Sequence, residues 1–138
     1  MSRLVLLALG LVLTLGCERM ALIKKCRGLA QRVNPELDAI EASVTAKQDA
    51  PTYQAVSERY TALAKEVGAF DAGAPDIDRA AADYANTLRS SGRKLGELAS
   101  AVDAGLAESA AVSRRELEQE AKRQKNVAKR FRQECQGH

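Results

Sequence analysis

The chain has 138 residues, of which 46% are apolar and 28% charged, and this composition excludes a disordered or low-complexity protein. Its length fits one domain rather than two. Aromatic residues make up only 4% and tryptophan is absent, so the core must be built from Ala, Leu and Val, which is typical of packed helices. The formal net charge of +3 is too small to indicate nucleic-acid binding, and we expect no nucleic-acid partner.

The N-terminus has the pattern of an export signal. A basic start at Arg3 precedes an apolar run from Leu4 to Leu15, which is shorter than the roughly 20 residues that a bilayer-spanning helix needs. The run ends in Leu13-Thr14-Leu15-Gly16-Cys17. This segment resembles the lipobox of bacterial lipoproteins, although Thr14 stands where that family prefers Leu.

The resemblance covers only the export signal and implies that residues 1–16 are a signal peptide. Cys17 would become the N-terminus and carry diacylglyceryl and N-acyl chains, which make a stable membrane anchor. Glu18 is not the Asp that signals inner-membrane retention in that family, so we expect the outer membrane, facing the periplasm. The alternative is a plain hydrophobic leader or N-terminal helix with an incidental cysteine.

Apolar residues spaced by three and four predict a first helix over about 20–48 and a second over 51–70. Pro35 interrupts the first pattern without changing its phase, which predicts a kink or a restart. Asp49 is positioned to cap the second helix, with Pro51 in its first turn.

A third helix is predicted over 76–104 and a fourth over 107–135. Asp76 is the expected N-cap of the third helix, and the sequence at 90–92 marks a weak point or a close helix contact. Gly105 is the expected C-cap, and the capping-box pattern of 113–116 marks a fresh start.

These stretches predict an all-α domain over 17–138 with the topology of an up-down-up-down four-helix bundle. The alternative is a three-helix arrangement in which the last two stretches form one long C-terminal helix. If Cys17 is lipidated, two cysteines remain in a compartment that permits disulfides, and we expect Cys26 and Cys135 to pair. Only the four-helix topology brings both to one end, so the cysteines favour a turn near Gly105. Two unrelated buried thiols are the alternative.

The sequence lacks the usual parts of an enzyme. It has no glycine-rich phosphate loop, no Cys-x-x-Cys and no paired histidines, so we expect no enzyme, metal or cofactor. A thiolate and an imidazole at Cys135 and His138 would be a poor metal site. The carboxylates are expected on a solvated surface, at Glu116, Glu118 and Glu120. The tyrosines are expected in the core with wet hydroxyl tips rather than in a ligand cavity, at Tyr53, Tyr60 and Tyr84.

Basic residues gather near both ends of the predicted domain and are expected to face the membrane beside Cys17. They are Arg19, Lys24, Lys25, Arg27, Lys129, Arg130 and Arg132. The alternative is that they complement the C-terminal dipole of the fourth helix and keep its outer face hydrated. We expect a lipid-anchored envelope protein acting as a structural or interaction module with an unknown envelope partner. The rivals are a periplasmic small-ligand or metal-stress binding protein, and an adaptor that offers an unpaired seam to another helical protein.

Overall fold

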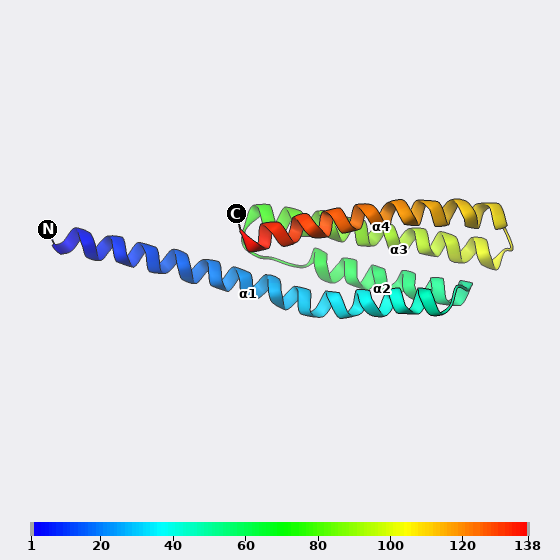
Figure 1. Ribbon diagram of the computed structural model, residues 1–138, viewed down its shortest axis with the longest axis horizontal. Coiled ribbons are helices and arrows are strands. Elements are labelled where there is room, and N and C mark those ends of the chain that lie inside the picture. The colour runs from blue at the N-terminus through cyan, green and yellow to red at the C-terminus, as the bar shows by residue number, and fades with distance from the viewer. Residues whose placement is uncertain (1, 138) are drawn as a thin grey trace.

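The structure is a computed structural model that describes residues 2–137, and the side chains of residues 16–137. Its four helices are α1 (Ser2–Ala46), α2 (Ala50–Gly68), α3 (Pro75–Asp103) and α4 (Ala107–Gln136). They run up-down-up-down (Figure 1), and no strand occurs between residues 2 and 137. The all-α four-helix prediction is confirmed, and the alternative with one long C-terminal helix is wrong.

The bundle has two distinct ends. The basal end holds the loop between α2 and α3 and the C-terminus of α4, and the distal end holds the other two loops (Figure 1). The N-terminal part of α1 projects beyond the basal end as a single rod. The helix α2 packs closely on α3, and α3 on α4, whereas α1 has looser contacts with α2 and α4.

The close approach of α2 to α3 depends on Gly92. A methyl group at Gly92 would lie 3.1 Å from the carbonyl oxygen of Ser57 and 3.2 Å from Cβ of Tyr60. The Ser57 hydroxyl donates a hydrogen bond to the Gly92 carbonyl at 2.6 Å. The sequence at 90–92 is therefore a close helix contact and not a weak point.

The start of α2 is as predicted, and the start of α3 is not. Asp49 accepts a hydrogen bond from the Thr52 amide at 3.0 Å. The pKa of Asp49 falls to about 2, chiefly because of the Thr52 side chain, with Lys47 and the Thr52 amide adding to the effect. Helix α3 begins at Pro75 behind Ala74, so the predicted cap at Asp76 is wrong. Proline's fixed φ suits the first helical position, which moves the start by one residue.

The turn between α3 and α4 is set by Gly105. This glycine has a φ of 69°. Its amide donates to the Val102 carbonyl at 3.1 Å, and the amide of Leu106 donates to the Ala101 carbonyl at 2.9 Å. These two bonds form a Schellman motif, so Gly105 ends α3 as predicted. Helix α4 begins immediately afterwards at Ala107, and the capping-box start at 113–116 is wrong because these residues lie inside the helix.

Helix α1 is longer and more continuous than predicted. It begins at Ser2 rather than near residue 20 and passes through Pro35 without a restart. Val33 and Ile40 are both buried, so packing on both sides of the proline holds one helix axis despite the missing donor. Of the predicted signal peptide, the structure describes the backbone of residues 2–16, and side-chain positions only at residue 16.

Candidate functional site

Cys17 lies on the surface of α1, close to the basal end of the bundle. Its thiol is exposed and free. Two residues later, Nη2 of Arg19 donates to the main-chain carbonyl of Gln136 at 3.3 Å. The C-terminus of α4 is therefore in contact with α1 within one helical turn of Cys17, and the predicted cleavage point lies inside a continuous helix.

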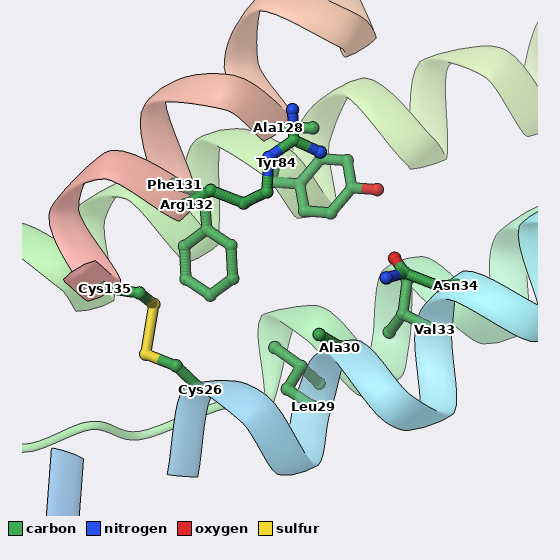
Figure 2. A pocket seen from close by; sticks show the side chains of 10 residues that line it. All are labelled: Cys26, Leu29, Ala30, Val33, Asn34, Tyr84, Ala128, Phe131, Arg132 and Cys135. Carbon is green, nitrogen blue, oxygen red and sulfur yellow. A yellow bond between two sulfur atoms is a disulfide. The ribbon is translucent and has the colours of Figure 1, made fainter. Parts of the chain in front are cut away.

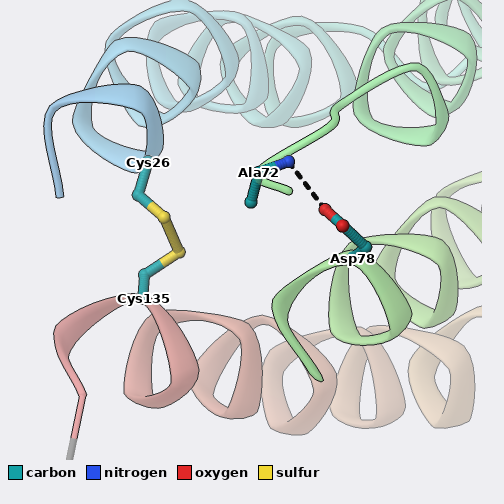
Figure 3. The surroundings of a disulfide bond; sticks show 4 residues. All are labelled: Cys26, Ala72, Asp78 and Cys135. Carbon is teal, nitrogen blue, oxygen red and sulfur yellow. Dashed lines mark hydrogen bonds between the residues drawn. A yellow bond between two sulfur atoms is a disulfide. The ribbon is translucent and has the colours of Figure 1, made fainter. Parts of the chain in front are cut away.

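Cys26 and Cys135 are joined in a disulfide at the basal end (Figure 3), as predicted, with their Cα atoms 6.0 Å apart. Both are buried. Across the same end, the Asp78 carboxylate accepts a hydrogen bond from the Ala72 amide at 2.7 Å, which fixes the loop between α2 and α3. The disulfide thus ties α1 directly to α4, two helices that otherwise have few contacts.

The predicted membrane-facing residues are all exposed, at Arg19, Lys24, Lys25, Arg27, Lys129, Arg130 and Arg132. They lie on the parts of α1 and α4 that meet at the basal end. Three of them have interactions within the bundle, one of which is the hydrogen bond from Arg19 to the Gln136 carbonyl described above. Arg130 forms an ion pair with Asp83 at 3.0 Å, and Lys25 donates to the Asp71 carbonyl at 3.4 Å. The loop between α2 and α3 also brings the acidic Asp71 and the start of α3 to this end. The basal end therefore has basic residues on α1 and α4 and acidic residues at the α2–α3 loop and the start of α3.

A basal pocket of about 70 Å³ lies between α1 and α4 beside the disulfide (Figure 2). Its walls are largely apolar, with Leu29 and Val33 on α1 and Phe131 on α4. The Phe131 ring packs edge-on against Phe70, with centroids 5.8 Å apart, and is stacked on Tyr84 at 6.2 Å. Tyr84 and Phe131 are both more than 90% buried. Burial raises the pKa of Tyr84 to about 12.

A second hollow continues along the same helices towards the distal end, and we name it the seam groove. Its volume is about 610 Å³, and it is open to solvent. Its apolar lining comprises Leu37, Ile40, Val44, Leu95, Leu117 and Ala121. The groove exists because α1 and α4 have few contacts beyond the disulfide, so α2 and α3 form its floor.

Polar groups converge on the floor of the seam groove. The Ser91 hydroxyl donates to Oε1 of Gln124 at 3.0 Å. Burial raises the pKa of Tyr60, opposed by its side-chain hydrogen bond with Gln124. Tyr60 and Tyr84 thus border hollows between helices, whereas Tyr53 is 3% exposed within the core. The expectation of core positions is correct for Tyr53 and Tyr84, and Tyr60 is half-buried.

Glu120 is an exception to the predicted solvated carboxylates. Its side chain is 8% exposed, and the nearest cation is Nη1 of Arg123 at 4.0 Å. No described residue forms a hydrogen bond with its buried Oε1. Glu118 is exposed as expected, and Glu116 is half-buried in an ion pair with Lys94 at 2.9 Å. The burial of Glu120 was not predicted, because the alternate spacing of the three acids favours a solvated surface. One pattern indicated its burial. Glu120 lies four residues before Gln124, and residues four apart lie on the same face of a helix.

Within the described residues, no group of three or more His, Cys, Asp or Glu side chains is arranged to hold a metal ion. His138 lies outside the described residues, so the terminal Cys135–His138 arrangement is not defined. In the part of the chain that the structure describes, no helix combines the length and the apolar character needed to cross a membrane. No protein family, curated protein or solved structure shows a significant match to the chain.

Proposed function

We propose that this chain is an exported lipoprotein whose helical bundle stands on a membrane surface and acts as a structural or protein-interaction module. The observation that carries the proposal is the lipobox-like segment 13–17 directly after a basic start and a short apolar run. Cys17 is exposed, as an acylated residue must be. The buried disulfide between Cys26 and Cys135 also favours an oxidising compartment outside the cytoplasm.

The position of Cys17 determines how the bundle would sit on the lipid. Only one helical turn separates Cys17 from the contact between Arg19 and the end of α4, so the anchor has no flexible linker. The basal end would lie against the head groups. There the exposed Lys24 and Arg27 add an electrostatic attraction to anionic lipids, worth up to about 1 kcal/mol per residue and weakened by salt.

We place the protein at the outer membrane, facing the periplasm, because Glu18 follows the cysteine where an inner-membrane lipoprotein of this family has Asp. A matched variant tests the placement. Density-gradient separation of the two membranes should find the wild-type protein in the outer membrane and Glu18→Asp shifted towards the inner membrane. If both proteins have the same distribution, Glu18 does not direct the sorting.

A specific observation supports a second candidate, a small-ligand binding protein. The basal pocket is apolar, has one side partly closed by the disulfide, and has the polar Arg132 and Asn34 among its lining residues. Ligand sites usually combine an apolar cavity with a few polar groups in this way. Its cavity volume, about 70 Å³, is well below the roughly 300–1,000 Å³ of drug-sized sites, so only a very small ligand would fit without a rearrangement of the walls.

The decisive experiment for the lipid anchor is the intact mass of the protein purified from membranes. We expect a chain that starts at Cys17 and carries acyl chains, with two thiols that react with an alkylating agent only after reduction. The matched control is Cys17→Ala, which should remain uncleaved and unacylated while its disulfide forms normally. A wild-type mass without acyl chains would refute the anchor. Two thiols that react without reductant would refute the pairing.

A further inference from the structure

We propose that the seam groove binds an amphipathic helix of an envelope protein, and that this helix carries acidic residues along one edge. The proposal deepens the interaction role given above, but it does not depend on acylation of Cys17. A chain without acyl groups would still have the groove.

The length and openness of the hollow fit a helix. The facing walls run from Leu37 to Thr45 on α1 and from Leu117 to Lys125 on α4, which is about 12 Å at 1.5 Å per residue. A helical segment of just over two turns has this length. Its apolar residues at i, i+3, i+4 and i+7 would lie on the aliphatic lining, as in other helix-in-groove complexes.

The same openness argues against a single lipid chain. A small-molecule site usually buries 70–90% of its ligand, whereas the seam groove is open to solvent along the gap between α1 and α4. A helix needs to bury only one face and leaves its polar face in water. The exposed polar wall residues Glu41 and Lys125 would then face the rim of the bound helix rather than its apolar face.

The charge of the α4 edge specifies the acidic character of the partner. Lys125 and Arg132 line the two hollows, and Lys129 lies between them on the same helical stripe. All three are exposed, and none forms an ion pair with a described side chain. The segment from Ala121 to Gln133 contains six basic residues and no acidic one. The three basic residues are spaced by four and by three, about one helical turn each, so they could pair with acidic residues placed one turn apart on a neighbouring helix.

The floor adds a single polar position that would set the register of the bound helix. Ser91 and Gln124 are hydrogen-bonded to each other, Tyr60 lies beside them, and six of the other lining residues are aliphatic. A partner helix would need one hydrogen-bonding side chain here, because an apolar residue would bury the partly exposed amide of Gln124 without a full set of partners. Isolated polar positions of this kind fix register in coiled coils.

The first test measures binding of designed peptides to the full-length lipoprotein in phosphatidylcholine nanodiscs, with empty nanodiscs as the background. The probe is a labelled 18-residue amphipathic helix with a Leu seam, one Gln and a Glu edge. The controls are the same peptide with Lys in place of Glu, and a scrambled peptide without amphipathic order. Fluorescence anisotropy should show the Glu-edged peptide binding at least about tenfold more tightly than either control, with an association rate that falls as salt rises.

Two pairs of variants locate the binding. Ala121→Phe fills the seam groove from an exposed position and should abolish binding, whereas Ala111→Phe, exposed elsewhere on α4, should not change it. Lys125→Glu with Lys129→Glu should weaken binding by at least about tenfold. The same change in net charge on the other helices, Lys65→Glu with Arg89→Glu, should have little effect. Circular dichroism should show that all four proteins remain folded.

Three results would overturn the proposal. The first is equal binding of the Glu-edged and Lys-edged peptides. The second is binding that survives Ala121→Phe. The third is saturable binding of palmitate that is blocked by Ala121→Phe and displaces the peptide, since this would assign the groove to an anionic amphiphile. None of these results affects the mass of the acylated N-terminus, so failure here is distinguishable from failure of the lipid anchor.

Discussion

Removal of the Cys26–Cys135 disulfide should have a large effect on stability, because it encloses most of the domain. The cysteines are 109 residues apart. On the chain-entropy relation, a loop of that length stabilises the folded state by about 4.8 kcal/mol. An unfolding entropy of about 2.1 cal/mol/K per residue over roughly 120 residues converts this value to a loss of about 20 °C in Tm.

The effect should also be uneven along the chain. Apart from the disulfide, α1 is held by buried side chains such as Leu29 and Ile40 and by a few exposed ion pairs. One of these pairs joins Arg32 to Glu66 at 2.6 Å. Such pairs contribute less than about 1 kcal/mol each. We therefore expect α1 to separate from the bundle at a lower free energy than α2, α3 and α4 need to unfold.

The measurement compares oxidised wild-type protein, reduced wild-type protein and the double variant Cys26→Ala with Cys135→Ala. Thermal unfolding followed by circular dichroism at 222 nm gives the Tm, and hydrogen exchange gives the protection of each helix. Cys17→Ala is the matched control and should keep the wild-type Tm. A fall of less than about 5 °C, or an equal loss of protection in all four helices, would refute the view that the disulfide holds α1 in place.

Three further predictions concern stability. Glu120→Gln removes a buried charge with no hydrogen-bond partner at Oε1, and it should raise the free energy of unfolding in urea by about 1–2 kcal/mol. The control Glu118→Gln, at an exposed site, should change this free energy little. If Glu120→Gln lowers the stability instead, the Glu120 carboxylate has a stabilising partner. Gly105→Ala should lower the free energy of unfolding by about 1–2 kcal/mol, because Gly105 has a φ of 69°. Gly28→Ala, inside α1, should raise it by about 0.5–1 kcal/mol. Changes of the opposite sign would contradict the backbone conformation at these two glycines. Burial raises the pKa of Tyr84 to about 12, above the ordinary tyrosine value of 10.0. Its contribution to stability is therefore complete below pH 10 and is lost as pH rises towards 12. Absorbance near 295 nm should show a tyrosine that ionises late, and Tyr84→Phe should remove that step.

The sequence predicts the helices well because their signals are local. The three- and four-residue spacing defines four helices, and the cap at Asp49 and the stop at Gly105 depend on neighbouring residues alone. The two helix starts predicted wrongly, at Asp76 and at 113–116, are sites where a polar residue could cap a helix. In both cases a proline or glycine earlier in the chain sets the start of the helix instead. Pro75 begins α3 one residue early. The Gly105 turn ends only two residues before α4 begins.

The hollows between α1 and α4 could not be predicted, because they depend on the distance between helices rather than on periodicity. Leu37 and Leu117 fit the same three- and four-residue spacing as buried core residues, yet they are only partly buried and line an open groove. The burial of Glu120 has the same origin. Its spacing suggests a solvated face, yet its side chain is only 8% exposed, because burial depends on how α4 packs in the bundle.

Helix α1 connects the three features on which the functional proposals rest. Cys17, Cys26 and the α1 wall of the seam groove lie on one uninterrupted helix. The disulfide fixes this helix to α4 near the proposed membrane surface and leaves the two helices free to diverge beyond it. Because a helix rises about 1.5 Å per residue, the start of the groove at Leu37 would stand about 30 Å from the acylated cysteine. A partner helix in the groove would therefore be held clear of the lipid head groups, where a water-soluble segment of another envelope protein could reach it.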